Sequence, residues 1–296
     1  MTVKIICDTS ADLNLPNDKT LYDKYDIGWV PMHVIFGTDD YKELLQIKTS
    51  VFYEKLYSSE KQPHTSQSTQ HDLLVAYEKY GEKYDEIISF HLSSKISGAV
   101  ANAQFAKKMY EKSNPDSAKV YIYDTLTASS LMGLSVIKAA QLAKEGLNAE
   151  EIIAIVKQWQ EKDIKLYFTV ENLRWLFEGG RLSKTKYYAA KIMSMNPIIT
   201  FIDGNLEVVK SVTGYDKSIS TSLKMLIEHF GDTEVKDLTL HFLESDFYEK
   251  AEEIAKSAQK QYPGLNIGEI FRIGGVIASH TGPHCLALMI TRNFEF

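Results

Sequence analysis

The chain of 296 residues is 44% hydrophobic and 11% aromatic, which is the composition of a globular protein and excludes a disordered or fibrous one. Its formal net charge is −6 and its pI is near 5.8. Because nucleic-acid-binding proteins neutralise phosphates with clustered Lys and Arg, this balance excludes a basic footprint, and we expect no nucleic-acid partner.

Three short apolar runs in the first half each end in polar residues, a pattern typical of buried strands that deliver side chains to the carboxyl edge of a parallel sheet. Helical spacing of apolar residues follows Ser97 and Asn148, which are the expected N-caps. Alternating strands and helices predict a parallel α/β sheet. The expected strands are 3–7, 87–92 and 120–123.

The pattern of the second half predicts a mixed sheet. A strand is expected at 164–168, and Asp203-Gly204-Asn205 predicts a hairpin between apolar runs on either side. Further strands are expected at 238–243 and 286–290, with a helix at 247–262. Because the chain is long for one core, we expect two domains: an N-terminal parallel-sheet α/β domain at 1–165 and a C-terminal mixed-sheet α/β domain at 166–296.

Hydroxyl groups crowd the turn between the strand at 87–92 and the next helix, where the sequence has Ser93, Ser94, Ser97 and Gly98. Free amides at a helix N-terminus attract anions, and a glycine lets a ligand approach the backbone. The segment therefore predicts a carboxylate or phosphate site. A serine-rich helix cap without a ligand is the alternative.

A second hydroxyl cluster begins at Thr65 and Ser66 and leads into a helix expected near His71. Neutral donors hold an anion less tightly than a bidentate Arg, so they suit a ligand that is later handed over. The alternative is a capped, solvated loop.

Residues 274–284 form an expected glycine-rich turn before the last strand, with His280 and His284 four residues apart. Functional residues concentrate in such loops, which favours a role for His280. The glycine and proline at 282–283 argue against a helix here, so we expect no metal site from this pair.

Arg181 is a further candidate, because it follows two glycines and precedes a helix expected near Lys184. A guanidinium is always charged and matches the geometry of a carboxylate. The alternative is a surface turn whose Arg is solvated.

The two cysteines, Cys7 and Cys285, lie far apart and each sits in an apolar run. We therefore expect neither a disulfide framework nor a zinc site, and we expect a reducing compartment. The opening apolar run is too short for a signal peptide, and no run approaches the ~20 residues of a membrane span. The expected location is the cytoplasm.

In their joint order, several segments resemble the DegV family, whose members include the fatty-acid-binding subunit of bacterial fatty acid kinase. The resemblance runs along nearly the whole chain. The matching segments are Asp8-Thr9-Ser10-Ala11-Asp12-Leu13, Pro31, Thr65-Ser66-Gln67, Leu92 to Gly98, Asp124, Gly133, Glu171-Asn172-Leu173, Gly179-Gly180-Arg181-Leu182-Ser183, Pro197-Ile198-Ile199 and His280-Thr281-Gly282-Pro283.

The resemblance implies a two-domain DegV-like fold in which an apolar tunnel of the N-terminal domain holds an acyl chain. It implies that Arg181 and His280 handle the head group or contact a kinase. The residues that it implies for the carboxylate are Thr65, Ser66, Ser97 and Gly98, with Ser93 and Ser94 nearby.

The implied function is to bind a long-chain fatty acid and to present its carboxylate to a separate kinase, which forms an acyl phosphate with ATP. No catalytic residue, metal or cofactor is expected in this chain. The sequence contains no Walker-type glycine-lysine loop, so the ATP chemistry is expected in the partner. A lipid ligand is also compatible with transient contact with a membrane surface.

Three alternatives stay open. Asp8 at a strand end, with Asp12 as acid or base, fits a hydrolase or phosphotransferase, although their spacing differs from that of haloacid-dehalogenase-type enzymes. Ser97 and His280 would suit a serine hydrolase, although the sequence has no Gly-x-Ser-x-Gly elbow. The last alternative is a regulatory or scaffold protein without a lipid.

Overall fold

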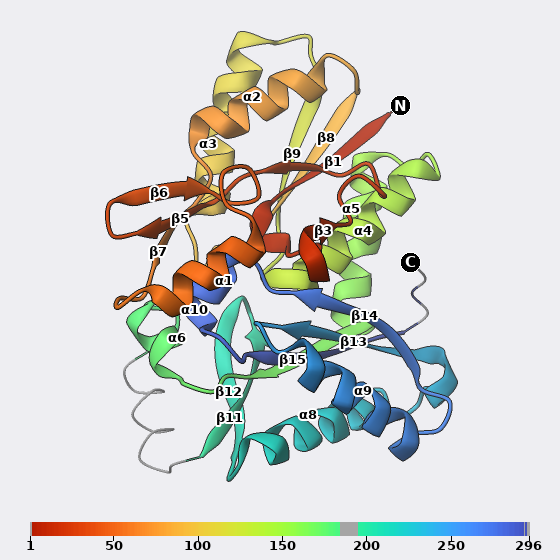
Figure 1. Cartoon of the computed structure of the whole chain (residues 1–296). Helices are drawn as coiled ribbons and strands as arrows, with labels where there is room; N and C mark the ends of the chain where they lie inside the picture. The colour runs from red at the N-terminus through yellow and green to blue at the C-terminus, as the bar shows by residue number, and fades with distance from the viewer. Residues whose placement is uncertain (1, 184–194, 293, 295–296) are drawn as a thin grey trace.

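The computed structural model describes residues 2–183, 195–292 and 294 (Figure 1). Its N-terminal part is built on a parallel four-stranded sheet in the order β4-β1-β8-β9, which confirms the expected α/β class. The carboxyl ends of these parallel strands share one edge of the sheet. The strands are β1 (Val3–Asp8), β4 (Gly28–Val30), β8 (Glu86–His91) and β9 (Lys119–Asp124).

Two helix pairs cover the two faces of this sheet. Alternate residues of β1 point to opposite faces, so Ile6 packs with the first pair and Ile5 with the second. The first pair is α2 (Gln70–Gly81) and α3 (Ala99–Ser113), and the second is α4 (Ser129–Lys144) and α5 (Ala149–Lys162).

One of the two expected N-caps forms. Asn148 caps α5 in a reciprocal capping box, in which its side chain accepts from the Glu151 amide at 3.0 Å and the Glu151 carboxylate accepts from the Asn148 amide at 3.0 Å. The expected cap at Ser97 is wrong. Gly98 is the N-cap of α3, and the Ser97 hydroxyl accepts from the Ala99 amide at 3.2 Å.

A small antiparallel sheet, β6-β5-β7, contains Thr65 and Ser66. The loop expected for these two residues is wrong, because they pair with Val34 and His33, in a strand about thirty residues earlier that local sequence does not reveal. The elements of this region are β2 (Asn14–Leu15), β3 (Lys19–Thr20), β5 (His33–Phe36), β6 (Asp39–Lys42), β7 (His64–Ser66), α1 (Thr49–Ser58), η1 (Thr9–Ala11) and η2 (Pro16–Asp18).

A six-stranded sheet in the order β12-β11-β10-β15-β13-β14 forms the C-terminal part. Only β13 and β14 run parallel among its described neighbours, so the sheet is mixed, as expected. The expected hairpin joins β11 to β12 through Asp203 and Gly204, both with positive φ. The strands are β10 (Ile164–Thr169), β11 (Asn196–Ile202), β12 (Asn205–Val212), β13 (Leu238–Glu244), β14 (Asn266–Arg272) and β15 (Leu286–Arg292).

The helices of this part divide between the two faces of the mixed sheet.

Residues 275–281 form a helix, so the expected turn at 274–284 is wrong over this stretch. The helix expected near Lys184 lies outside the described residues. The elements are α6 (Arg174–Glu178) and α10 (Gly275–Thr281) toward the N-terminal part, α8 (Tyr215–His229) and α9 (Tyr248–Gln261) on the other face, and η3 (Val235–Asp237).

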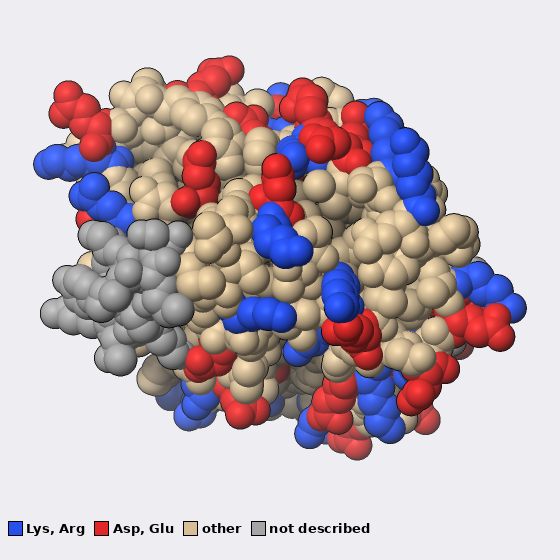
Figure 2. Space-filling model, turned by 90° about the horizontal axis from the view of Figure 1, so that it is seen from below, with Lys and Arg blue, Asp and Glu red and all other residues tan. Residues whose placement is uncertain are grey.

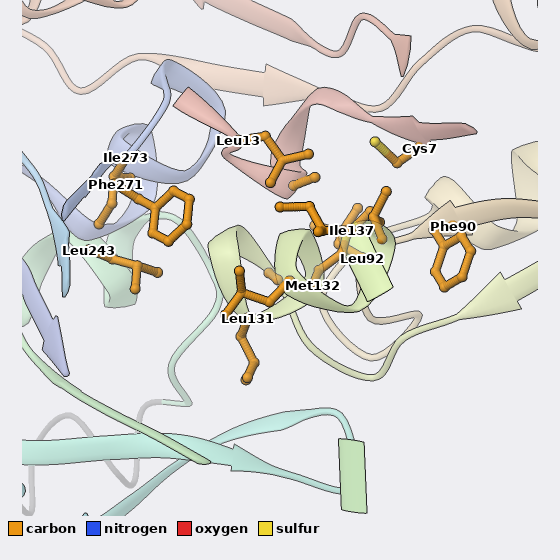
Figure 3. Close-up of a cluster of buried hydrophobic side chains, with 14 of the residues drawn as sticks. Cys7, Leu13, Phe90, Leu92, Leu131, Met132, Ile137, Leu243, Phe271 and Ile273 are labelled. Atoms are coloured by element: carbon orange, nitrogen blue, oxygen red, sulfur yellow. The ribbon is translucent and has the colours of Figure 1, made fainter. Parts of the chain in front are cut away.

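The hydrophobic core is continuous between the two parts. β10 begins at Ile164, beside the expected domain boundary, yet buried residues on both sides of this point belong to one cluster. Figure 3 shows Leu243 and Phe271 of the mixed sheet on one side of α4, and Cys7 and Phe90 of the parallel sheet on the other. The two parts therefore pack as one body.

Charges of both signs are interspersed on the face of the molecule shown in Figure 2, rather than gathered by sign. Within the described ranges, no helix is both long and apolar enough to cross a membrane.

Candidate functional site

An apolar cavity lies between the two sheets and has walls from both parts of the chain. It contains about 820 Å³ of space, its open mouth included. The resemblance placed the tunnel in the N-terminal domain, whereas the C-terminal sheet supplies much of this wall. Wall residues include Met32 and Leu92 from the first part and Phe168, Phe201, Leu243 and Ala287 from the second.

Four of the predicted residues line the cavity: Ser97 and the trio of Thr65, Arg181 and His280. Thr65 lies in β7, and His280 lies in the last turn of α10. A hydrogen bond of 2.7 Å joins Thr65 Oγ1 to His280 Nε2 across 215 residues of sequence. The fold thus forms a polar trio at one end of an apolar space.

The imidazole of His280 is neutral at physiological pH. Burial, and then the proximity of Arg181 and His64, lower the pKa of His280 to about 3. Its Nδ1 is buried without a hydrogen-bond partner among the described residues, and a Cβ at position 179 would collide with it, which explains the glycine there. His280 therefore acts as a hydrogen-bonding group and not as a cation.

Arg181 supplies the positive charge of the site. Its Nε donates to the Ile96 carbonyl at 3.2 Å and its Nη1 to the Gly179 carbonyl at 2.5 Å. Burial lowers the pKa of the guanidinium, and no carboxylate of the described residues pairs with it. Because a partly buried cation without a counter-ion is costly, this end of the cavity favours an anion.

Ser97 and Gln67 also line the cavity. The bond from Arg181 to the Ile96 carbonyl brings the turn that carries Ser97 next to the guanidinium. The Gln67 amide nitrogen lies 3.2 Å from the point where a Cβ on Gly98 would stand, so the glycine leaves room for this side chain. No role was assigned to Gln67 from the sequence, although its place in the Thr65-Ser66-Gln67 motif was a usable signal.

The other predicted carboxylate ligands lie outside the described cavity wall: Ser66, Ser93, Ser94 and Gly98. Ser93 is fully buried and donates to the Gly204 carbonyl at 2.7 Å, so it holds the β11–β12 hairpin. The Ser94 side chain is exposed, while its amide donates to Asp124 Oδ1 at 3.2 Å. Ser66 follows Thr65 in β7 and points to the opposite face of that strand.

The polar trio also borders the surface. Thr65, Arg181 and His280 line both the cavity and an outer cleft whose rim includes Lys61 and His64. A head group bound by the trio would face this cleft, whereas an attached chain would lie between the sheets.

Asp8 is not placed as a nucleophile, because its side chain is fully buried. It accepts from the Ser10 amide at 3.1 Å and the Leu92 amide at 3.3 Å, and it lies 3.1 Å from His91 Nδ1. Asp12 is equally buried. Both carboxylates are internal acceptors near the end of β1.

His280 and His284 diverge in the structure. His284 pairs with Glu171 Oε2 at 2.9 Å, whereas His280 faces the cavity. In the described part of the chain, no group of three or more His, Cys, Asp or Glu side chains could hold a metal ion.

A parallel and a mixed sheet with an apolar cavity between them, closed by a cation and hydroxyls, define a class of α/β binding protein. The chain belongs to the DegV family: the family model described as "Uncharacterised protein, DegV family" matches residues 2–293.

Solved structures of this family have the same fold. The chain is 27% identical to DegV from Bacillus subtilis, described as a fatty acid binding protein, with a TM-score of 0.86 and 99% of each chain covered. It is 26% identical to a DegV family protein from Thermus thermophilus, described by its fatty acid binding, with a TM-score of 0.83 over 99% of this chain and 100% of that one. The Streptococcus pneumoniae Fatty Acid Kinase B3 protein, loaded with linoleic acid, shares the fold at 22% identity, with a TM-score of 0.80 over 99% and 100% of the two chains.

Proposed function

We propose that the protein binds a long-chain fatty acid and presents its carboxylate to a partner kinase, which forms an acyl phosphate with ATP. The observation that carries this proposal is the guanidinium of Arg181, which pairs with no carboxylate of the described residues, beside Thr65 and His280 at the end of an apolar cavity. The Bacillus and Thermus relatives, described as fatty acid binding, support the ligand class.

The energetics favour an acyl chain with an acid end. Burying a methylene group contributes about 0.8 kcal/mol, so a sixteen-carbon chain contributes roughly 10 kcal/mol before ordering costs. A carboxylate buried without partners would cost several kcal/mol, which Arg181 and the hydroxyls of Thr65 and Ser97 offset. The acyl chain thus contributes most of the affinity, and the polar end of the cavity selects for the carboxylate.

We infer that the protein acts as a carrier and not as the catalyst. The trio faces the outer cleft, where a second protein can reach a bound carboxylate. Residues 1–165 and 166–296 would serve as the two domains that enclose the acyl chain. The alternative of an Asp8-dependent hydrolase or phosphotransferase receives no support, because the Asp8 carboxylate is fully buried.

The ligand is tested by solvent extraction and mass spectrometry of the purified protein, followed by titration with hexadecanoate and with its methyl ester. Arg181→Met should weaken binding of the acid roughly 10- to 100-fold, as expected for a lost hydrogen bond to a charged group, and should change binding of the ester little. Lys224→Met, which removes an exposed cation of α8, is the matched control. Equal losses for acid and ester would overturn the proposal.

The presentation step is tested separately. Protein loaded with hexadecanoate is incubated with ATP, with and without a bacterial fatty acid kinase, and acyl phosphate is trapped with hydroxylamine. Product should form only when the kinase is present. Product formed by the protein alone would contradict the carrier role.

A further inference from the structure

The position of α10 decides the geometry of the polar trio. Val276, Ile277, His280 and Thr281, four of its seven residues, line the cavity. The bond between His280 and Thr65 spans from α10 to β7, so a shift of α10 would break it. Whatever fixes the start of α10 therefore also fixes the head-group end of the cavity.

Two carboxylates from distant parts of the N-terminal region receive the first amides of α10. The Gly274 amide donates to Asp12 Oδ1 at 2.9 Å, and the Val276 amide donates to Glu43 Oε1 at 2.9 Å. Asp12 ends η1, and Glu43 follows β6. Because the amides at a helix start lack partners within the helix, these side chains anchor α10 to the parallel-sheet part.

The two carboxyl groups are close neighbours. Asp12 Oδ1 and Glu43 Oε1 lie 2.6 and 2.7 Å from the point where a Cβ on Gly274 would stand. Asp12 is fully buried and Glu43 is 2% exposed. Neither pairs with a cationic side chain within 4.0 Å in the described ranges. Two carboxyl groups that are this close together and this well shielded from solvent cannot both be ionised at low cost.

The neighbouring titratable groups do not relieve this cost. Asp8 lies near both carboxyl groups and raises the pKa of each, whereas Tyr22, Tyr53 and Cys285 face them as neutral groups, because burial raises their own pKa values. Ser129 donates to Asp12 Oδ2 at 2.5 Å, whereas Glu43 Oε2 is buried without a hydrogen-bond partner among the described residues. An unpartnered oxygen costs less on a neutral carboxyl than on a carboxylate, so the site favours one proton on the pair.

We propose that Asp12 and Glu43 are positioning residues that hold α10, and with it His280, while they share one proton, and that loss of this proton loosens α10 and weakens ligand binding. Burial, and then the charge of Glu43, raise the pKa of Asp12, and burial raises the pKa of Glu43 to about 7. The anchor is therefore intact at mildly acid pH and is lost as the pH rises above neutrality. For ligand binding, this inference rests on the proposed function.

The ligand-binding test compares wild type with Glu43→Gln, which keeps the amide acceptor and cannot ionise. Affinity for hexadecanoate is measured from pH 6 to pH 9. Wild-type affinity should fall roughly tenfold over this range, as expected when about a tenth of the molecules remain able to bind the ligand. The affinity of Glu43→Gln should be nearly independent of pH. Asp12→Asn is a second variant that should also flatten the profile.

Glu86→Gln is the matched control. Glu86 is likewise buried, and it accepts from the Ala149 amide at the start of α5 at 2.8 Å, but it does not line the cavity. This variant should keep the wild-type pH profile. The inference is overturned if Glu43→Gln also keeps that profile, or if Glu86→Gln flattens it equally.

Hydrogen exchange of the amides of residues 275–281 tests the anchor without any ligand. After correction for base catalysis, protection should fall between pH 6 and pH 9 in wild type and stay constant in Glu43→Gln. Equal protection profiles would overturn the inference. If wild type binds no hexadecanoate at any pH while the exchange result is as expected, the proposed function fails and the anchoring role stands.

Discussion

At the scale of single residues, the head-group end of the cavity combines one cation with one neutral imidazole. Arg181 carries the charge, and His280 stays neutral because it is buried beside that charge. A second cation would hold a carboxylate more strongly than a carrier needs, since the carboxylate must later be released. The pair therefore suits selective but reversible binding of an acid.

His280 should make folding stability depend on pH. The pKa of His280 is about 3 in the folded protein, below its ordinary value of 6.5, so the unfolded chain binds the proton first as the pH falls. Its contribution is fully present above pH 6.5 and is lost toward pH 3. Between pH 6.5 and pH 5, wild type should lose up to roughly 2 kcal/mol more than His280→Gln.

Urea denaturation at several pH values checks this difference. His71→Gln, which replaces an exposed histidine at the start of α2, should follow wild type throughout. If the free energy of unfolding depended on pH in the same way for wild type and His280→Gln, His280 would not be held neutral by the fold.

The sequence allowed some members of the site to be predicted and hid others for a physical reason. Thr65, Arg181 and His280 stand in polar or glycine-rich segments, which mark loops and strand ends near ligands. Glu43 lies among ordinary charged residues, and only the fold brings it beside Asp12. Contacts between distant segments leave no local pattern, so the anchor of α10 could not be predicted.

At the scale of elements, the turn at 92–98 performs two separate tasks. Ser93 attaches it to the β11–β12 hairpin, and Ser97 contributes to the cavity wall. The two hydroxyls are four residues apart and look equivalent in sequence. Burial separates them, because Ser93 is fully enclosed while Ser97 is half-buried.

Ser93→Ala and Ser97→Ala should therefore affect different properties, the first mainly folding stability and the second mainly ligand binding. Ser93→Ala leaves the Gly204 carbonyl without its donor and should cost about 1–3 kcal/mol of folding free energy. Ser97→Ala removes only a half-buried acceptor of the Ala99 amide, so it should cost less stability than Ser93→Ala and weaken binding of hexadecanoate severalfold. Denaturation curves and ligand titration of both variants check this, and the prediction fails if Ser97→Ala is the more destabilising change.

Elements with a local signal could be predicted from the sequence, and others could not. Most strands of the two sheets and helix α5 lie close to their expected positions, because apolar runs and the Asn148 cap are local signals, whereas β4 and β14 had no expected counterpart. α10 has seven residues between glycines, too few to show a helical period, and distant carboxylates stabilise its start. The three-residue strand β7 likewise depends on its pairing with β5.

At the scale of the whole molecule, the cavity could not be predicted, because its apolar wall residues look like any other core residue in sequence. Two of them, Leu166 and Phe201, also line a second cleft between helices α4 and α5 and the mixed sheet. These two side chains therefore form a partition between the two spaces. Leu166 is buried, whereas Phe201 is half-buried.

Phe201→Ala should remove part of this partition and admit longer acyl chains. Two extra methylenes that become buried contribute about 1.6 kcal/mol at about 0.8 kcal/mol each, so the affinity for a twenty-carbon acid relative to an eighteen-carbon acid should rise roughly tenfold. Leu131→Ala is the control, because Leu131 lines the second cleft but not the cavity. An unchanged ratio in Phe201→Ala, or an equal rise in Leu131→Ala, would contradict the prediction.

The walls of the cavity come from segments near the carboxyl ends of the parallel strands and from one face of the mixed sheet, so the cavity lies at the seam between the two parts of the chain. An occupant would contact both parts at once. Ligand binding and the contact between the two parts are therefore linked. A bound ligand makes separation of the two parts less favourable, and any event that separates them also releases the ligand. Release of the ligand would thus require only a small separation of the two parts along the seam, without unfolding of either part.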